Sequence, residues 1–200
     1  ICVVFSTLRF GVNAQSSSVT YIPDANFEAY LESNGMGNNV ANDQYVFTSA
    51  IDTATALSID NLSISSLEGI ASFSNLSYLD CSGNLLISLD LSQNTNLTFL
   101  EASNNVSLSF LNVTNGNNQN FTNFNTIGDS LLYCIGVDNV SWSQLNWTNI
   151  MPQHAFVQSY LTAVVTACDV FTFKDSTYTS SGTYYHYGGE DSTNCDTLTI

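Results

Sequence analysis

The chain has 200 residues, of which 44% are hydrophobic and 12% aromatic, so it carries enough apolar surface for a core in one or two domains and wholesale disorder is not expected. Its formal net charge is -15, because 17 acidic residues face only two basic ones, Arg9 and Lys174. We expect no nucleic-acid partner, because phosphate binding depends on clustered lysine and arginine.

Residues 1–14 are apolar and end in Val12-Asn-Ala14 ahead of Gln15, a small-residue pattern typical of a signal-peptidase site. We expect these residues to be a partial signal peptide of a truncated fragment, with a buried amino-terminal strand as the alternative. No later run reaches the roughly 18 to 20 apolar residues of a membrane span. The sequence therefore predicts a secreted or cell-surface protein without a membrane span, and its oligomeric state stays open.

The segment from Tyr21 to Gly35 has the pattern of a short amphipathic helix. Asp24 follows a proline and is predicted to be the N-cap, and Gly35 is predicted to adopt the left-handed conformation that ends a helix. Phe27, Tyr30 and Leu31 fall on one face. We predict that residues 21–53 form an amino-terminal helical cap over a repeat array, with a strand-like stretch at its end that begins at Tyr45.

A repeat follows from residue 54. Its leading apolar triplets begin at Ala54, Leu76, Leu97 and Phe121, which gives spacings of 22, 21 and 24 residues. One coil of this length cannot bury its apolar face alone, so neighbouring coils must stack into a solenoid. Three asparagines close half-repeats at turns, where an inward amide hydrogen-bonds the backbone of adjacent coils, and we expect a structural role for them: Asn84, Asn94 and Asn105.

The segments Leu79-Asp-Cys-Ser-Gly-Asn, Leu89-Asp-Leu-Ser-Gln-Asn and Asn115-Gly-Asn-Asn-Gln-Asn resemble the short, irregular repeats of secreted leucine-rich-repeat proteins of Bacteroidetes. The resemblance covers roughly residues 21–150. It implies a right-handed leucine-rich-repeat solenoid over residues 54–150, with one strand per coil on a concave face. Leu132 to Asp138 and Trp142 to Trp147 resemble the closing cap of that family, and Thr126 is a polar residue in an inward slot.

After an expected linker over residues 151–167, residues 168–200 alternate aromatic and polar residues, which predicts strands and turns. They resemble a small all-β module that is often appended to such proteins, here incomplete. Cys168 and Cys195 bracket this segment and are the candidate disulfide pair, whereas Cys81 takes a repeat position expected for a small buried hydrophobe. The pairing states of Cys81 and Cys134 stay open.

No catalytic motif surrounds the two histidines, His154 and His186, and the carboxylates are scattered, so we expect no enzyme activity and no cofactor. No close group of cysteine and histidine predicts zinc. Calcium at the oxygen-rich stretches 38–43 and 169–175 is a minor alternative to solvated acidic loops, because neither has the spacing of a known calcium loop.

Residues between the inward leucines of each strand point outward, and in stacked coils they form rows. We expect these rows to be the binding surface, because they place aromatic rings beside acids and amides. The alternative is a solvated face on which two aromatic residues occur by chance. The predicted binding residues of the concave face are Tyr78, Asp80, Phe99, Glu101, Asn123 and Asn125.

Together these features predict a binding or adhesion protein that recognises a protein or a polysaccharide. Two alternatives stay open at this stage. One is a structural stalk or surface-layer component without a specific ligand, whose repeats only hold distance. The other is the binding part of a larger secreted protein whose catalytic domain lies beyond residue 200.

Overall fold

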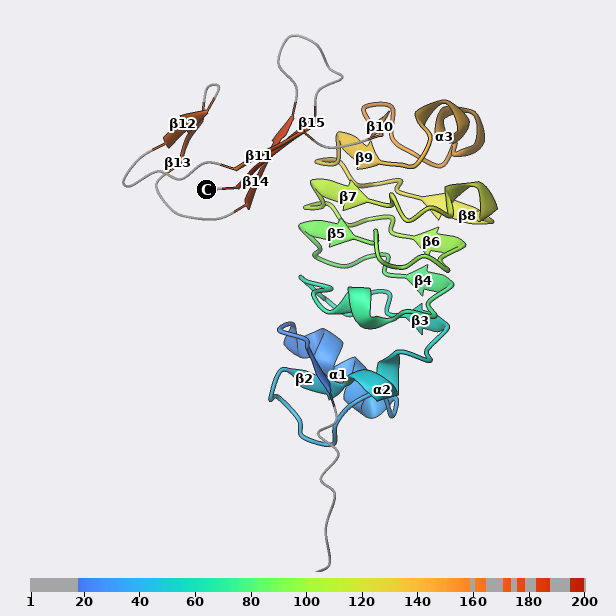
Figure 1. Cartoon of the computed structure of the whole chain (residues 1–200), viewed down its shortest axis with the longest axis vertical. Helices are drawn as coiled ribbons and strands as arrows, with labels where there is room; N and C mark the ends of the chain where they lie inside the picture. Colours follow the sequence, from blue (N-terminus) through green and yellow to red (C-terminus); the bar gives the residue numbers. More distant parts are fainter. Residues whose placement is uncertain are drawn as a thin grey trace, which may run out of the picture.

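The computed structural model describes residues 18–158 and, after them, the backbone of five further strands. The described coils stack one above the next, so that equivalent segments lie side by side (Figure 1). The elements up to residue 158 are β1 (Val19–Tyr21), α1 (Ala25–Ser33), β2 (Tyr45–Phe47), α2 (Thr48–Ile51), β3 (Ala56–Ser58), the 3-10 turn η1 (Ile70–Ser72), β4 (Tyr78–Asp80), β5 (Ser88–Asp90), β6 (Phe99–Glu101), β7 (Phe110–Asn112), the 3-10 turn η2 (Asn118–Asn120), β8 (Asn123–Asn125), β9 (Cys134–Gly136), α3 (Val140–Asn146) and β10 (Ala155–Val157).

Two parallel sheets run along the solenoid. The first sheet has the order β3-β4-β6-β8, and the second sheet has the order β5-β7-β9-β10. Leu57, Leu79, Leu100 and Phe124 are in register in the first sheet, which is what the spacing of the repeat predicts. The structure adds a second strand to most coils, whereas one strand per coil was expected, and this accounts for the half-repeat around Leu89.

The core is one continuous cluster of inward side chains, because residues at alternate strand positions point to the same side. The expected inward leucines are buried, among them Leu76, Leu79, Leu89, Leu97 and Leu111. Cys81 is buried and free, as expected of a small hydrophobe at its repeat position. Stacked leucine-rich coils are therefore the architecture of the chain from β3 to β10.

Helix α1 begins where the sequence predicted, with Asp24 as its N-cap. The Asp24 Oδ1 accepts hydrogen bonds from the backbone N–H of Asn26 and of Phe27, both at 3.0 Å. Its Oδ2 accepts from the backbone N–H groups of Ser65 at 2.7 Å and Ser66 at 3.2 Å. One carboxylate therefore both starts the helix and ties it to the first coil.

The packing of α1 agrees with this connection. Phe27 stacks on Phe73 of the first coil with ring centroids 6.1 Å apart, and Leu31 is fully buried. Gly35 has a φ of 72°, the left-handed conformation expected after the helix. Strands β1 and β2 pair antiparallel beside the helix. Whether this region acts as a cap that shields the first coil stays a prediction.

The carboxyl end of the solenoid differs from the expected layout. Residues 132–138, which resembled a closing cap, contain β9, a strand of the second sheet. Residues 155–157 lie within the expected linker, yet they form β10 and pair with β9 in parallel. The reason is the burial of Phe156, which packs edge-on against Trp147 at 5.7 Å and extends the core by another turn of chain.

Five strands follow residue 158, and their backbone pairing forms a three-stranded sheet β11-β15-β14 and a two-stranded sheet β12-β13. Strands over residues 168–200 were expected, although the structure does not describe their side chains. The side chains of the candidate pair Cys168 and Cys195 lie outside the described residues, and so does the expected signal at residues 1–14. Cys134 is disulfide-bonded. The strands are β11 (Leu161–Val164), β12 (Phe171–Phe173), β13 (Ser176–Tyr178), β14 (Thr183–Tyr187) and β15 (Cys195–Thr199).

Candidate binding surface

The outer face of the first sheet carries an aromatic pair. Tyr78 on β4 and Phe99 on β6 are register partners, and their rings stack with centroids 4.3 Å apart and planes 18° from parallel. Both side chains are half-buried, so part of the pair is accessible to solvent. Neighbouring parallel strands bring these rings together because the repeat places an aromatic residue at the same position of successive coils.

Acids and amides form the row beside the aromatic pair. The Asn125 Nδ2 donates to both carboxylate oxygens of Glu101, at 2.9 and 3.0 Å. The Asp80 Oδ1 accepts from the backbone N–H and the hydroxyl of Ser82. These bonds hold the carboxylates in fixed orientations on the sheet. We call the six predicted residues the outer row, and the structure places all of them on this one face: Tyr78, Asp80, Phe99, Glu101, Asn123 and Asn125.

The outer row continues into a shallow hollow of about 120 Å³ at the carboxyl end of the sheet. Asn123 and Phe124 line one side of it, and Trp147 and Asn149 line the other. The hollow is smaller than the roughly 300 to 1,000 Å³ of a typical small-molecule pocket. The sequence analysis assigned Trp147 to the closing cap and not to a binding surface, and its ring stacks on that of Phe124 with centroids 3.9 Å apart. The outer row therefore suits a flat macromolecular contact better than an enclosed ligand.

Inside the solenoid, equivalent polar side chains of successive coils bond the backbone. The Asn84 Nδ2 donates to the carbonyl oxygens of Ile59 at 2.7 Å and Cys81 at 2.9 Å. The Asn105 Nδ2 donates to the carbonyls of Cys81 at 3.1 Å and Ala102 at 2.7 Å. Each amide thus links two coils, and the structure places both asparagines away from any binding face.

Asn94 lies in a separate turn but uses its amide in the same way. Its Nδ2 donates to the carbonyl oxygens of Ile70 at 2.9 Å and Phe73 at 3.2 Å, and the residue is fully buried. Its own backbone carbonyl accepts from the Asn115 Nδ2 at 3.1 Å. The side chain therefore joins consecutive coils and contributes nothing to the outer row.

The next residue in the Asn84 and Asn105 series is an acid, Asp129, which the sequence pattern did not single out. Its Oδ1 accepts from the Asn105 backbone N–H at 2.7 Å, while its Oδ2 is buried without a partner. Burial raises the pKa of Asp129 to about 8, against the lowering effect of the Asn105 N–H and with a further increase from the charge of Glu101. The carboxyl group is therefore mostly protonated at neutral pH.

His154 lies against the same region. Its Nδ1 is 3.1 Å from the hydroxyl of Thr126, and its Nε2 is 3.1 Å from the backbone carbonyl of Asp129. Burial lowers the pKa of His154, so the ring is neutral at physiological pH. This arrangement satisfies the polar Thr126 in its inward slot. Both side chains are buried, so this hydroxyl and this imidazole bond each other within the core.

Residues 18–158 hold no group of three or more His, Cys, Asp or Glu side chains with the geometry of a metal site. In the oxygen-rich stretch 38–43, Asp43 Oδ2 accepts from the Asn38 Nδ2 at 2.9 Å and its Oδ1 accepts from the Tyr45 N–H at 2.9 Å. These oxygens therefore already accept hydrogen bonds within the loop. Among the described helices, none combines the length and the hydropathy needed to cross a bilayer.

Comparisons with known proteins give structural neighbours only. No family model matches the chain, and no curated protein matches it. Among solved structures, an internalin, InlF, from Listeria monocytogenes is 19% identical with a TM-score of 0.44, over 71% of this chain and 43% of that one. The functional domain of InlJ from Listeria monocytogenes is 20% identical with a TM-score of 0.38, over 60% of this chain and 38% of that one. This chain therefore spans less than half the length of both.

Proposed function

We propose that this protein is a non-enzymatic binding protein, and that the outer row of the first sheet contacts a protein ligand at the surface of a cell. The observation that carries the proposal is the stacked, half-buried pair Tyr78 and Phe99, which lies beside Asp80 and Glu101 on the same two strands. Half-buried aromatic residues in a rigid setting are the typical anchors of protein interfaces.

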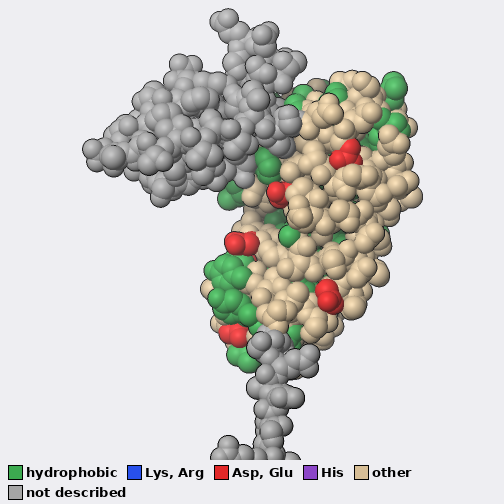
Figure 2. Space-filling view, in the orientation of Figure 1, with side chains coloured by type: hydrophobic (Ala, Val, Ile, Leu, Met, Phe, Trp, Pro, Cys, Tyr) green, Lys and Arg blue, Asp and Glu red, His purple; other side chains and the backbone are tan. Residues whose placement is uncertain are grey.

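The charges of this surface indicate the chemistry of the partner. Residues 18–158 contain no lysine or arginine, so the carboxylates of the outer row have no cationic neighbour within the described part of the chain. Figure 2 accordingly shows scattered acidic side chains and no basic ones on the described part of that view. The complementary surface is one that presents lysine or arginine around an apolar centre. A polysaccharide is the alternative ligand, and a stalk without a ligand is the alternative function.

The test compares retention of variants on an array of extracellular proteins and surface polysaccharides. Tyr78→Ser with Phe99→Ser removes both rings, whereas Val106→Ser with Leu131→Ser removes two apolar side chains that are 56% and 51% exposed outside the outer row. Loss of a central aromatic anchor costs about 2 kcal/mol, so each ring removal weakens binding roughly 30-fold.

The control pair is expected to bind as the wild-type protein does. Retention on basic proteins that disappears only with the ring variants supports the proposal. Retention on polysaccharides alone makes the ligand a glycan. Equal binding of all variants, with an intact fold by circular dichroism, contradicts the assignment to the outer row.

A further inference from the structure

The second sheet begins one coil later than the repeat predicts. Ser66-Leu67-Glu68 stands one repeat ahead of Ser88-Leu89-Asp90, with the same order of serine, leucine and acid. Leu67 is buried as Leu89 is. Yet only the later triplet is a strand, β5, and the sheet order ends there. The first coil therefore supplies no strand to pair with β5.

Two contacts hold the first coil away from β5. The Asp24 Oδ2 accepts the backbone N–H of Ser65 and of Ser66, which draws this segment towards helix α1. Gly69 then adopts a φ of 96° and packs so closely on β1 that an added Cβ would lie 2.6 Å from the Tyr21 carbonyl oxygen. The chain continues into the 3-10 turn η1, which bonds within itself.

The edge of β5 consequently has unpaired backbone groups. In a parallel sheet, successive residues direct their N–H and C=O groups to alternate neighbours. The Leu91 N–H donates to the backbone carbonyl of Asn112, and the Ile87 carbonyl accepts from the backbone N–H of Ser109. The backbone groups of these odd-numbered residues therefore point towards β7. Ser88 and Asp90 therefore face the first coil, and no described group bonds their backbone N–H or C=O.

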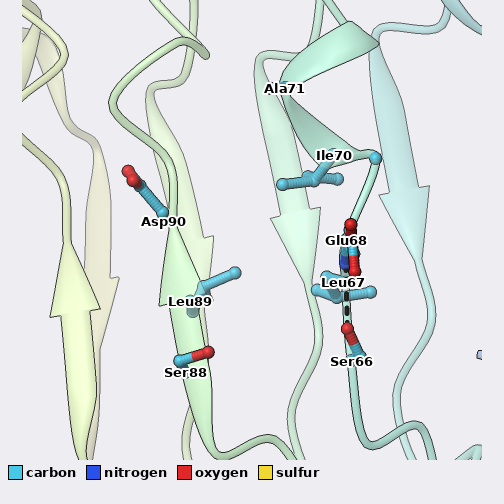
Figure 3. A pocket seen from close by; sticks show the side chains of 9 residues that line it. Ser66, Leu67, Glu68, Ile70, Ala71, Ser88, Leu89 and Asp90 are labelled. Atoms are coloured by element: carbon cyan, nitrogen blue, oxygen red, sulfur yellow. Dashed lines mark hydrogen bonds between the residues drawn. The ribbon is translucent and has the colours of Figure 1, made fainter. Parts of the chain in front are cut away.

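A hollow of about 310 Å³ lies at this edge. Figure 3 shows β5 on one side of it and the segment from Ser66 to Ala71 on the other. Glu68 and Asp90 are exposed residues that line it from opposite sides, and Ile87, which is 59% exposed, precedes the strand. The Asp90 Oδ1 accepts from the Ser92 N–H at 3.0 Å and from the Asn112 Nδ2 at 3.2 Å. With no lysine or arginine in residues 18–158, neither carboxylate has a cationic partner among the described residues.

We propose that the edge of β5 is a peptide-binding site, which takes an extended cationic segment of another protein as an additional strand. The main chain of the peptide bonds Ser88 and Asp90, as in other cases of strand addition to a sheet edge. Its lysine or arginine side chains meet Glu68 and Asp90. The site belongs to the second sheet and is independent of the outer row.

The probe is a fluorescein-labelled peptide of eight residues that alternates lysine and valine, measured by fluorescence anisotropy. Its control is the same peptide methylated at the backbone nitrogens of every second residue, which keeps the charge but removes the N–H donors of one edge. Amide hydrogen exchange of Ser88 and Asp90 reports the site directly. Both amides are expected to exchange freely in the unbound protein and at least tenfold more slowly with peptide.

Matched variants separate hydrogen bonding from charge. Ser88→Pro removes an unpaired N–H of an edge strand, where proline is tolerated. Its control is Ser58→Pro, which makes the same change on β3, the edge strand of the first sheet. We expect at least tenfold weaker binding for Ser88→Pro only. Glu68→Gln with Asp90→Asn is expected to weaken binding three- to tenfold, whereas Asp60→Asn leaves it unchanged. Circular dichroism verifies the fold of each variant.

Three results would overturn the proposal. Protection of the Ser88 and Asp90 amides in the unbound protein would mean that residues 66–68 close on β5. Equal affinity for the methylated peptide would mean attraction by net charge alone. A dimer in sedimentation equilibrium that Ser88→Pro dissolves would assign the edge to a second copy of this chain. None of these results changes what the Tyr78 and Phe99 variants show about the outer row, so the two proposals are tested separately.

Discussion

Replacing Asp129 with asparagine is expected to stabilise the protein at neutral pH. Asparagine is the residue at the equivalent positions 84 and 105, where the Nδ2 donates to two backbone carbonyls. In Asp129 the corresponding atom is Oδ2, which is buried without a partner. The side-chain amide that Asp129→Asn introduces keeps an acceptor for the Asn105 N–H and supplies the missing donor.

The magnitude follows from the raised pKa. The pKa of Asp129 is about 8 in the folded protein against an ordinary value of 3.8, because burial disfavours the charged form. A folded-state pKa above the unfolded value means that the native state holds a proton that the unfolded chain releases. The contribution of Asp129 to the free energy of unfolding is therefore greatest below pH 4 and falls by about 1.4 kcal/mol per pH unit until pH 8. Between pH 4 and pH 7 the loss is up to about 4 kcal/mol.

The assay is urea unfolding followed by circular dichroism at pH 4, 5.5, 7 and 8. Relative to Asp129→Asn, the wild-type protein is expected to lose stability across this range. Asp60→Asn changes the net charge by the same amount but keeps Asp129, so it is expected to follow the wild type. Asp129→Asn is expected to lack the additional slope and to exceed the wild type at pH 7. Parallel profiles for both proteins, with Asp129→Asn less stable at every pH, would refute a protonated Asp129 and indicate an ionised one.

Three further predictions concern stability and reactivity. Asp24→Ala removes a helix N-cap and the bonds to the first coil, so we expect a loss of roughly 2 to 3 kcal/mol in urea unfolding, and a loss below 0.5 kcal/mol would contradict the joint role. Leu79→Ala leaves a cavity in the stacked core and is expected to cost about 2 to 5 kcal/mol by the same measurement, whereas Ile87→Ala, at an exposed site, stays within about 0.5 kcal/mol. Burial raises the pKa of the Cys81 thiol, so iodoacetamide should label this free cysteine only in denaturant. Mass spectrometry of the peptide obtained by cleavage before Asp80 and Asp90 would show this, and rapid labelling of native protein would count against the burial of Cys81.

The first sheet and its outer row follow closely from the sequence. A repeat of 21 to 24 residues places Leu57, Leu79, Leu100 and Phe124 at equivalent positions, and strict alternation then decides which residues face outward. The helix α1 was recognisable for a similar reason, because its N-cap, its apolar face and its terminal glycine are local signals. The spacing of the repeat was therefore sufficient for the first sheet, and local signals were sufficient for the helix.

Features that depend on distant contacts were not predictable in this way. The hydrogen bonds from Ser65 and Ser66 to Asp24 join residues more than forty positions apart. They lie directly beside Ser66-Leu67-Glu68, where the second sheet has no strand. Asp129 resembles other turn acids in the sequence, and only the stacked coils around it remove the solvent from its Oδ2. The neighbouring residues in the sequence do not indicate that another coil buries a side chain.

The most direct measurement of the proposed function is oxidative footprinting of the aromatic residues with and without a ligand selected on the array. Tyr78 and Phe99 are expected to become at least fivefold less reactive in the complex. Tyr21 on β1 and Tyr45 on β2 serve as internal controls, whose reactivity should not change. Their ring centroids are 5.4 Å apart and each residue is 41% exposed. Unchanged reactivity of Tyr78 and Phe99, with protection at the control pair or elsewhere, would contradict recognition through the outer row.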